Sequence, residues 1–440
     1  MATTACGARF CNDPVDTQGS ASAAEKGNQA RRLANSAPNP PRPEQMRQQA
    51  TNVPNALRPS AVSGPTNVPV NDAVFADARG RRPRILLVTD RPPGGDSGYG
   101  MRVDNVIVGL MTAGDLHVCL IDSSIGGASL PLDAGYETSV IRAENPPKWR
   151  KLLHAVVALA HLPYQRTGHL RLALAARLGA EPWDVVWFSR ARTYSICKGL
   201  FKAKTVVDFD DLNDTLSRGL IADRKARYGR IMAAPRNLVG TIEAWRWSRL
   251  QRQIADEVSC VTVCSEDDRS YLGFDNCAVV TNGYRIPTSV RRSPNREQPT
   301  LLFVGPLSYE PNRLAAEWLA FELLPRVRRV LPTARAVLIG YNGGVSPRLR
   351  DAEGVTLTGY VHDLGSYYAM ASVAVVPLRS GGGTRLKVAE ALARSVPLVA
   401  TSVGCYGLDL THHQEVLIAD DAEAFAAACV SIINDPKLAD

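Results

Sequence analysis

The sequence predicts an α/β protein built from two consecutive, doubly wound parallel sheets. Short apolar runs of strand length alternate with longer helical patterns in two series, one starting at Arg84 and the other at Leu301. A polar, proline-containing stretch over residues 291–299 separates the two series and is typical of an interdomain linker. Because strands that alternate with helices favour parallel sheets covered on both faces, we expect two Rossmann-like domains.

The first domain is predicted to cover residues 84–290. Its strands are expected at residues 84–89, 117–121, 185–188, 205–207, 258–264 and 278–281, and its clearest helices at 101–112, 152–178 and 242–254. A glycine-rich loop opens the first helix, where Gly98 and Gly100 would let the backbone approach a donor or acceptor, and an ordinary loop fits equally well. The loop lacks the order G-x-G-x-x-G, so a nicotinamide enzyme is not favoured.

The second domain is predicted to cover residues 300–440. Its strands are expected at residues 301–304, 335–339, 355–357, 373–376, 397–400 and 415–418, and its helices at 312–330, 384–393 and 423–433. Ligands of doubly wound sheets bind beyond the carboxyl ends of the strands. A ligand is therefore expected between the two domains.

Composition limits the classes of function. Residues 1–80 are predicted to be disordered and outside the fold, because they are rich in Pro, Ala, Asn, Ser and Arg without periodicity. The net charge of +8 suggests attraction to anions such as nucleotides, phosphorylated acceptors or an acidic membrane surface. Nucleic acid is not favoured, because the basic residues are not interleaved with aromatic ones.

The sequence also bears on location. Residues 1–11 lack the apolar core of a signal peptide, and the longest apolar stretch, residues 152–162, is too short to span a bilayer. The nine cysteines are odd in number and scattered, which indicates reduced thiols. We therefore expect a cytoplasmic protein, with any membrane contact peripheral and at the inner membrane face.

The most informative motif joins an apolar strand at residues 373–376 to a helix expected from Thr384. Three glycines, Gly381 to Gly383, would let the backbone approach a ligand, and the free N–H groups of the helix start would face a phosphate. Arg385 and Lys387 add cations in the first turn, where an anion opposite would stabilise them. Lys387 and Glu390 could instead form a plain surface pair three residues apart.

Three other features carry less specific signals. Asp208, Asp210 and Asp211 follow a strand and could serve as a base, contact an acceptor or cap a helix; a metal site is less favoured. His362 ends a predicted strand and is expected to face the ligand. Residues 218–252 are strongly basic and fit either a solvated helix face or an anionic lipid surface.

Several short motifs follow one another in order along the chain. In the second half they are Phe303-Val304-Gly305-Pro306-Leu307, Pro311-Asn312, Gly359-Tyr360-Val361-His362-Asp363, and Gly381-Gly382-Gly383-Thr384-Arg385-Leu386-Lys387 with Glu390. In the first half they are the loop at Gly98 and Gly100 and the triplet Thr281-Asn282-Gly283. Together these motifs resemble the retaining GT-B glycosyltransferases of group 1, in a family 4-like form with the GGGTRLK variant.

The resemblance implies a GT-B fold, with two Rossmann-like domains facing each other across a cleft. It implies transfer of a sugar from a nucleotide donor with retention at the anomeric carbon, no cofactor and no obligatory metal. The acceptor could be a glycan, a lipid-linked sugar or a small molecule.

The resemblance also implies roles for individual residues. Glu390 would hold the donor ribose, and Arg385 and Lys387 would neutralise the leaving diphosphate. Asp210 falls near the place where many members have a histidine close to the acceptor. The remaining matches line the donor: Gly305, Gly382, Gly383 and Thr384.

The chain departs from the family in two places that bear on activity. Gly382 replaces the first of two glutamates, and the stretch from Gly305 to Glu310 lacks the usual Arg and Lys. Members also usually continue past the position of Asp440 with a helix that packs on the first domain. Two alternatives therefore stay open: a non-catalytic nucleotide-sugar-binding scaffold, or another GT-B enzyme such as a sugar-nucleotide epimerase.

Overall fold

The computed structural model describes residues 81–94, 98–122, 130, 135–142, 168–284 and 292–439, all of which belong to one compact unit, Pro69–Asp440. The predicted disordered segment 1–80 lies outside these residues, as does the first part of the helix predicted at 152–178.

The first sheet has seven parallel strands in the order β3-β2-β1-β4-β5-β6-β7. Six of them lie within a few residues of the predicted strands, so the predicted parallel sheet is confirmed. The strand β3 was not predicted, because only two of its residues are buried and its apolar signal is weak. The strands are β1 Arg84–Thr89, β2 Asp115–Asp122, β3 Glu137–Arg142, β4 Val185–Phe188, β5 Lys204–Phe209, β6 Cys260–Val263 and β7 Cys277–Val279.

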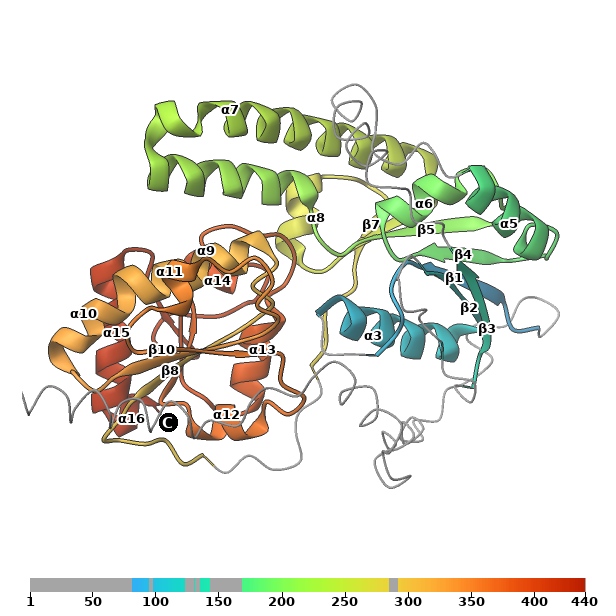
Figure 1. The fold of residues 1–440 in the computed structure, drawn as a ribbon. Coiled ribbons are helices and arrows are strands. Elements are labelled where there is room, and N and C mark those ends of the chain that lie inside the picture. The colour runs from blue at the N-terminus through green and yellow to red at the C-terminus, as the bar shows by residue number, and fades with distance from the viewer. Residues whose placement is uncertain are drawn as a thin grey trace, which may run out of the picture. The chain divides into compact units, whose positions relative to one another are not determined.

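Helices cover both faces of this sheet (Figure 1). Alternate residues of β1 point to opposite sides: Ile85 and Leu87 pack with α3, and Leu86 and Val88 belong to the core shared with α5 and α6. Burial on both faces explains why β1 is apolar throughout. The helices of this part are α3 Gly98–Ala113, α5 Gly168–Leu178, α6 Ala191–Cys197, α7 Asn213–Glu257 and α8 Glu266–Leu272.

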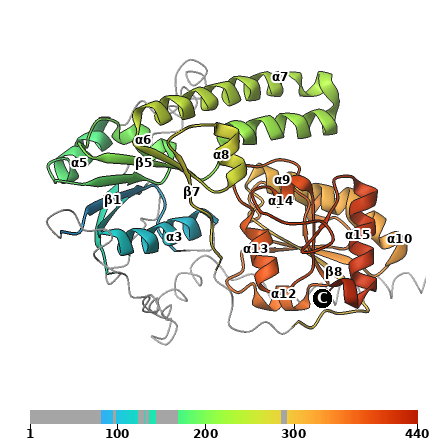
Figure 2. The same cartoon turned by 180° about the vertical axis from the view of Figure 1, so that it is seen from behind.

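The helix α7 folds back on itself as two arms (Figure 2). The break falls at Gly229, whose φ of 74° and ψ of 167° are not helical, so the first arm precedes Gly229 and the second arm follows it as far as Glu257. The sequence predicted only residues 242–254 of it, because the basic residues hide the apolar periodicity of the rest. Within the described part of the chain, no helix combines the length and the apolar character that crossing a bilayer requires.

The second sheet has six parallel strands in the order β10-β9-β8-β11-β12-β13, which confirms the second predicted sheet. Its strands are β8 Thr300–Val304, β9 Arg335–Ile339, β10 Val355–Gly359, β11 Val373–Val376, β12 Leu398–Ala400 and β13 Leu417–Ile418. Its helices are α9 Glu310–Trp318, η3 Leu319–Leu323, α10 Leu324–Val330, α11 Pro347–Arg350, α12 Gly365–Met370, α13 Leu386–Ala393, α14 Ser402–Cys405, α15 Ala422–Asn434 and α16 Pro436–Ala439.

The single helix predicted at residues 312–330 is three pieces. A π-helical turn, η3, separates α9 from α10. Pro325 lies just after it and lacks the N–H that an uninterrupted helix needs. The helix predicted from Thr384 begins at Leu386, since Arg385 has a non-helical φ of −86° and ψ of 83°.

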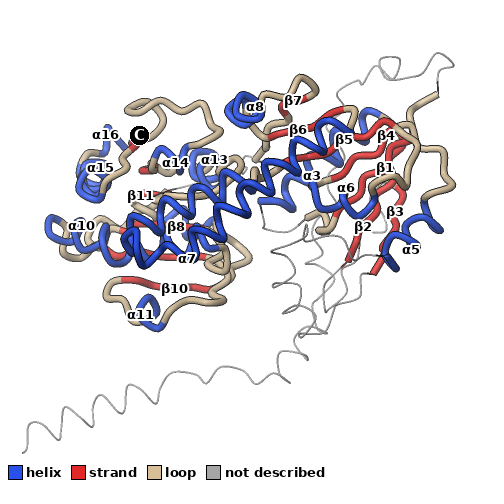
Figure 3. The backbone as a smooth tube through the Cα atoms, turned by 90° about the horizontal axis from the view of Figure 1, so that it is seen from above, coloured by secondary structure: helices blue, strands red, loops and turns tan. Residues whose placement is uncertain are grey.

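Both sheets are built in the same way (Figure 3). In each, the chain adds strands outward on one side of its first strand and then crosses to the other side, so the order reverses between β1 and β4 and between β8 and β11. Loops that leave the carboxyl ends of strands at such a reversal form the usual ligand site. The glycine motif follows β11, directly beside β8.

Candidate functional site

The loop between β11 and α13 has a backbone that only glycine fits. Gly381 has φ of +147° and Gly383 has φ of +66°. A Cβ at Gly381 would lie 2.7 Å from Nη2 of Arg385, and a Cβ at Gly383 would lie 2.6 Å from the carbonyl oxygen of Asp210. The loop is therefore packed tightly between its own arginine and the acidic segment of the first domain.

Unsatisfied polar atoms gather at this loop. Among the described residues, Ser380 Oγ, Thr384 Oγ1 and Arg385 Nη2 are buried side-chain atoms without a hydrogen-bond partner. Buried polar groups are nearly always paired, so each unpaired one calls for an explanation such as a bound ion or ligand. Three potential donors within six residues, at the switch point of the sheet, point to an anionic ligand.

Arg385 lies beneath the loop and supports it. The side chain is only 6% exposed, and Nη1 donates to the carbonyl of Gly382 at 2.5 Å while Nε donates to the carbonyl of Val403 at 3.2 Å. Burial lowers the pKa of this guanidinium, although nearby groups such as Asp211 oppose the shift. The guanidinium still has one donor without a partner among the described residues, Nη2, which is available to an anion.

Lys387 reaches the loop after β8. Its Nζ donates to Oδ1 of Asn312 at 2.6 Å and lies 4.9 Å from the centre of the Phe303 ring. Burial, with a further contribution from Arg385, lowers the pKa of Lys387 to about 7. Gly305 makes room for this arrangement, because a Cβ there would lie 2.7 Å from Asn312 Nδ2 and 3.0 Å from Lys387 Nζ.

Glu390 lies one turn after Lys387 in α13, is buried, and has partners of its own. The hydroxyl of Tyr284 donates to Glu390 Oε1 at 2.8 Å, and Arg394 lies 3.5 Å from the same oxygen. Burial raises the pKa of the Glu390 carboxyl. The surface pair between Lys387 and Glu390 that the sequence left open is thus wrong, because each side chain has another partner.

The acidic segment of the first domain contributes Asp210 and Asp211. Burial raises the pKa of Asp210 to about 7, helped by Asp211 and Asp208, and burial likewise raises the pKa of Asp211. The sequence placed these acids far from the glycine motif along the chain. The structure brings them against it, at Gly382 and Gly383.

Asp208 has a structural role instead. Both of its carboxylate oxygens accept hydrogen bonds from Arg102 at 2.6 Å, and Thr262 donates to Oδ1 at 2.7 Å. Arg102 is 1% exposed and also donates to Asn282 Oδ1 at 2.8 Å. The pair therefore ties α3 and β5 to the turn that leaves the first sheet.

The remaining predicted site residues do not all lie at the glycine loop. A Cβ at Gly98 would lie 3.1 Å from Leu386, so the start of α3 lies against the start of α13. Gly100 is buried in the first turn of α3. His362 is an exposed residue that follows the edge strand β10, with its ring 5.4 Å from that of Tyr360. The structure brings Gly98 to the candidate site and places His362 on the surface, three strands away from β11.

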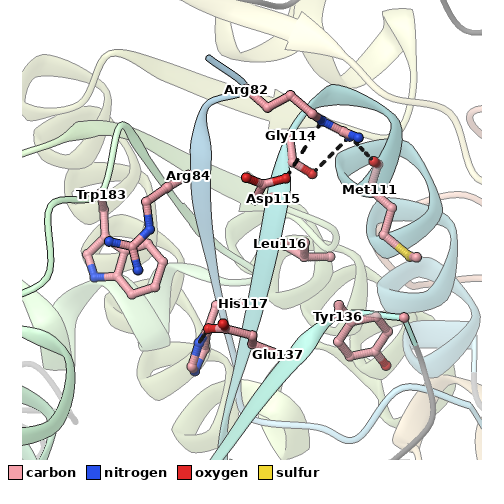
Figure 4. Close-up of a pocket in the computed structure, with 11 residues that line it drawn as sticks. Arg82, Arg84, Met111, Gly114, Asp115, Leu116, His117, Tyr136, Glu137 and Trp183 are labelled. Carbon is pink, nitrogen blue, oxygen red and sulfur yellow. Dashed lines mark hydrogen bonds and ion pairs between the residues drawn. The ribbon is translucent and has the colours of Figure 1, made fainter. Parts of the chain in front are cut away.

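A cavity of about 670 Å³ lies at the other edge of the first sheet, at the amino ends of β1, β2 and β3 (Figure 4). Its charged side chains are paired with their neighbours: Arg82 donates to the carbonyls of Met111 and Gly114, and His117 Nδ1 lies 3.0 Å from Glu137 Oε2. Parallel sheets bind ligands at the opposite edge, so we place the functional site at the glycine loop.

Two residues that contact the predicted site residues were not predicted from the sequence. Tyr284 follows the Asn282-Gly283 turn and contacts Glu390 from the other domain, which no local pattern signals. Asn312 belongs to the Pro311-Asn312 motif, which signalled its position without revealing its hydrogen bond to Lys387.

Comparison with known proteins relates the second half to one family. Residues 298–435 match the family model described as Glycosyl transferases group 1. A Klebsiella pneumoniae protein, described as an uncharacterized 44.6 kDa protein in the cps region, is 27% identical over 146 residues. That match covers 31% of this chain and 37% of the relative, so the chain spans just over a third of its length.

Solved structures resemble the chain over most of its length. Sucrose-phosphate synthase from Thermosynechococcus elongatus superimposes with a TM-score of 0.58 at 17% identity, covering 81% of this chain and 91% of the other. Anabaena Alr3699/HepE, solved with UDP and glucose, gives a TM-score of 0.55 at 12% identity with the same coverage. At such identities the likeness shows the fold alone. The chain thus has the two-domain GT-B fold, and its residues 298–435 are similar to group 1 glycosyltransferases.

Proposed function

We propose that the protein transfers a sugar from a nucleoside-diphosphate sugar to an acceptor hydroxyl, with retention at the anomeric carbon and without a bound metal. The three unpaired buried polar atoms at the glycine loop carry this proposal, because a diphosphate would satisfy them. The family match of residues 298–435 and the GT-B fold support it.

The cations act on the leaving group. When the bond between the anomeric carbon and the phosphate oxygen breaks, negative charge grows on the diphosphate. Nη2 of Arg385 and Nζ of Lys387 belong to residues that directly follow the loop, and they would stabilise this added charge more strongly than the charge that the diphosphate already carries in the ground state. This role replaces the Arg and Lys that are missing between Gly305 and Glu310.

The acceptor side belongs to the first domain. The acceptor oxygen forms the new bond to the anomeric carbon and loses its proton. Asp210 lies next to the glycine loop, and its pKa of about 7 suits a group that exchanges protons near neutral pH. We therefore assign Asp210 to the acceptor side, where the acceptor could be a glycan, a lipid-linked sugar or a small molecule.

Calorimetric titration with UDP, GDP, ADP and dTDP in the presence of EDTA tests the donor site. We expect one nucleotide to bind selectively, and Glu390→Ala to weaken it about 10-fold by removing a hydrogen-bonded ribose partner. Binding that requires an added divalent cation would overturn the metal-free part of the proposal. No binding by any nucleotide, with the protein folded, would overturn the donor site itself.

Turnover separates the proposal from its alternatives. Release of nucleotide from the matching sugar donor, with an acceptor-dependent rate, is expected of a transferase, and NMR of the product reports the anomeric configuration. Nucleotide binding without turnover would favour the scaffold, and isomerisation of the sugar nucleotide without an acceptor would favour the epimerase.

We also propose a peripheral contact of the second arm of α7 with an anionic membrane surface. Leu238 and Trp245 lie two turns apart on the outer face and are 64% and 60% exposed. Arg249 follows one turn later, with its guanidinium 5.9 Å from the Trp245 ring, and Arg252 is exposed on the same face. An apolar and aromatic stripe flanked by cations fits the interface of anionic lipids.

Sedimentation with vesicles tests this contact. We expect binding to vesicles that contain phosphatidylserine, little binding to pure phosphatidylcholine, and loss of binding in the double variant Leu238→Ala with Trp245→Ala. Tyr341→Ala is the matched control, because Tyr341 is 63% exposed but lies in the second domain. Equal losses in both variants would contradict the assigned surface.

A further inference from the structure

We propose that the hydroxyl of Tyr284 takes the place of a ribose hydroxyl of the donor on Glu390 in the ligand-free protein, so that a ribonucleotide must displace it from Glu390. The inference rests on the proposed function, in which Glu390 accepts hydrogen bonds from the donor ribose. It adds a residue from the first domain that sets how tightly, and with what sugar preference, the donor binds.

The carboxylate of Glu390 is engaged by the chain itself. Tyr284 donates to Oε1 at 2.8 Å, Arg394 lies 3.5 Å from that oxygen, and Tyr368 is a further hydrogen-bond partner. Glu390 is only 8% exposed. The covered carboxylate leaves little room for ribose hydroxyls, and the withdrawal of one of these three side chains would provide that room.

Tyr284 is the partner that can withdraw most easily. Tyr368 is 1% exposed within the core of the second domain, and Arg394 caps the carboxyl end of the helix that holds Glu390, with its guanidinium 5.1 Å from the centre of the Tyr368 ring. These two move with Glu390. Tyr284 instead comes from the segment that leaves β7, so its hydrogen bond is the one that joins the carboxylate to the other domain.

The first domain fixes where Tyr284 lies. Arg102 Nη1 donates to Asn282 Oδ1 at 2.8 Å, and Asn105 Nδ2 donates to the carbonyl of Gly283 at 3.0 Å. Both donors belong to α3, whose Arg102 is bound by the buried Asp208. The turn before Tyr284 is thus held to the first sheet, which presents the phenol to Glu390.

The competition is between groups of the same chemistry. A phenol and a ribose hydroxyl each donate one hydrogen bond to a carboxylate, and hydrogen bonds to charged groups are stronger than neutral ones. The Tyr284 hydroxyl also accepts a hydrogen bond from Arg394 Nη2 at 3.1 Å, so nucleotide binding must exchange both of these bonds for bonds of the ribose, and the intrinsic affinity of the site is partly masked. Phenylalanine at position 284 would keep the ring and remove the competitor.

Titration calorimetry with UDP, GDP and ADP, each beside its 2′,3′-dideoxy form, tests this inference in the wild type and in Tyr284→Phe. We expect Tyr284→Phe to bind the preferred ribonucleotide about 10-fold more tightly, because the displaced hydrogen bond no longer opposes binding. The dideoxy form has no ribose hydroxyls to place on Glu390, so its affinity should stay unchanged. The matched control is Tyr194→Phe, since Tyr194 donates to Glu257 at the same 2.8 Å in the first domain.

The outcomes are distinct. Weaker ribonucleotide binding by Tyr284→Phe would show that Tyr284 supports Glu390 and would overturn the inference, as would no change or an equal gain for both nucleotide forms. In each of these cases the donor site itself stands. Absence of nucleotide binding by both folded proteins would overturn the proposed function and this inference with it.

Discussion

The two domains share one strand order yet present opposite chemistry at the carboxyl ends of their strands. Beyond β5, the first domain places the partly buried acids Asp210 and Asp211. Beyond β8 and β11, the second places glycines and the cations Arg385 and Lys387. The common topology brings these loops to the reversal of each sheet whatever residues they contain. The fold thus sets the location, and the residue types decide which half holds an anion.

The charged groups of each domain help to keep those of the other domain ionised. Burial disfavours the ionised form of every one of these groups, raising the pKa of the acids and lowering that of the cations. Arg385 and Asp211 oppose this effect for each other across the glycine loop. Substitutions of the cations and of the acids should therefore differ in their effects on turnover and on nucleotide affinity.

Lys387→Ala should have the largest effect. It removes a cation from the leaving group, and we expect turnover to fall about 1000-fold. Affinity for the nucleoside diphosphate should fall as well, because the diphosphate contacts the same cation. Steady-state kinetics and calorimetry measure both quantities, and Lys387→Arg, which keeps the charge, should recover part of each. Full activity of Lys387→Ala would refute the assignment of the leaving group to the cations of the second domain.

Asp210→Asn, in the acidic segment of the first domain, should have a smaller effect on turnover than Lys387→Ala. We expect turnover to fall about 100-fold, since proton exchange with the acceptor is lost. Nucleotide affinity should remain that of the wild type, because Asp210 belongs to the acceptor half. A large loss of nucleotide affinity in this variant would show instead that the acid positions the glycine loop.

The sequence predicted the second half better than the first, and the reason is physical. The glycine loop is contiguous, so backbone demands, cations and the strand before it are all visible in one stretch around Gly381 to Lys387. The contacts of Asp211 with Gly383 and of Tyr284 with Glu390 join residues more than a hundred positions apart. Local patterns signal backbone geometry, whereas they do not reveal which buried side chains tertiary packing will bring together.

The pKa of Lys387 predicts a pH effect on stability. Its folded-state pKa of about 7 lies below the ordinary 10.5, so between these values the unfolded chain binds a proton that the folded one does not. Lys387 should therefore contribute a rise in the free energy of unfolding above pH 7, of roughly 2 kcal/mol up to pH 9, which the thiols oppose as pH 9 is approached because burial raises their pKa, as at Cys277 and Cys405. Asp210, with a raised pKa of about 7, acts in the opposite direction but only below that pH. Urea unfolding of the wild type and of Lys387→Met at pH 7.5 and 9 isolates the contribution of Lys387, because the thiols are the same in both proteins. The same change with pH in both proteins would assign the effect to another group.

The smallest expected effect concerns the contact between α7 and the second domain. Arg224 Nη2 lies 3.0 Å from both carboxylate oxygens of Glu310, and the two side chains are 18% and 37% exposed. Exposed ion pairs contribute little and are screened by salt, so Glu310→Gln should lower the free energy of unfolding by about 0.5 kcal/mol at low salt and by less at high salt. Glu322→Gln is the control within one domain, because Glu322 pairs with Arg326 at 2.8 Å. A change in nucleotide affinity in the Glu310 variant, with none in the Glu322 variant, would mean that the first arm of α7 does more than stabilise the fold. The contact between Arg224 and Glu310 would then also position the donor-binding residues of the second domain relative to the acids of the first.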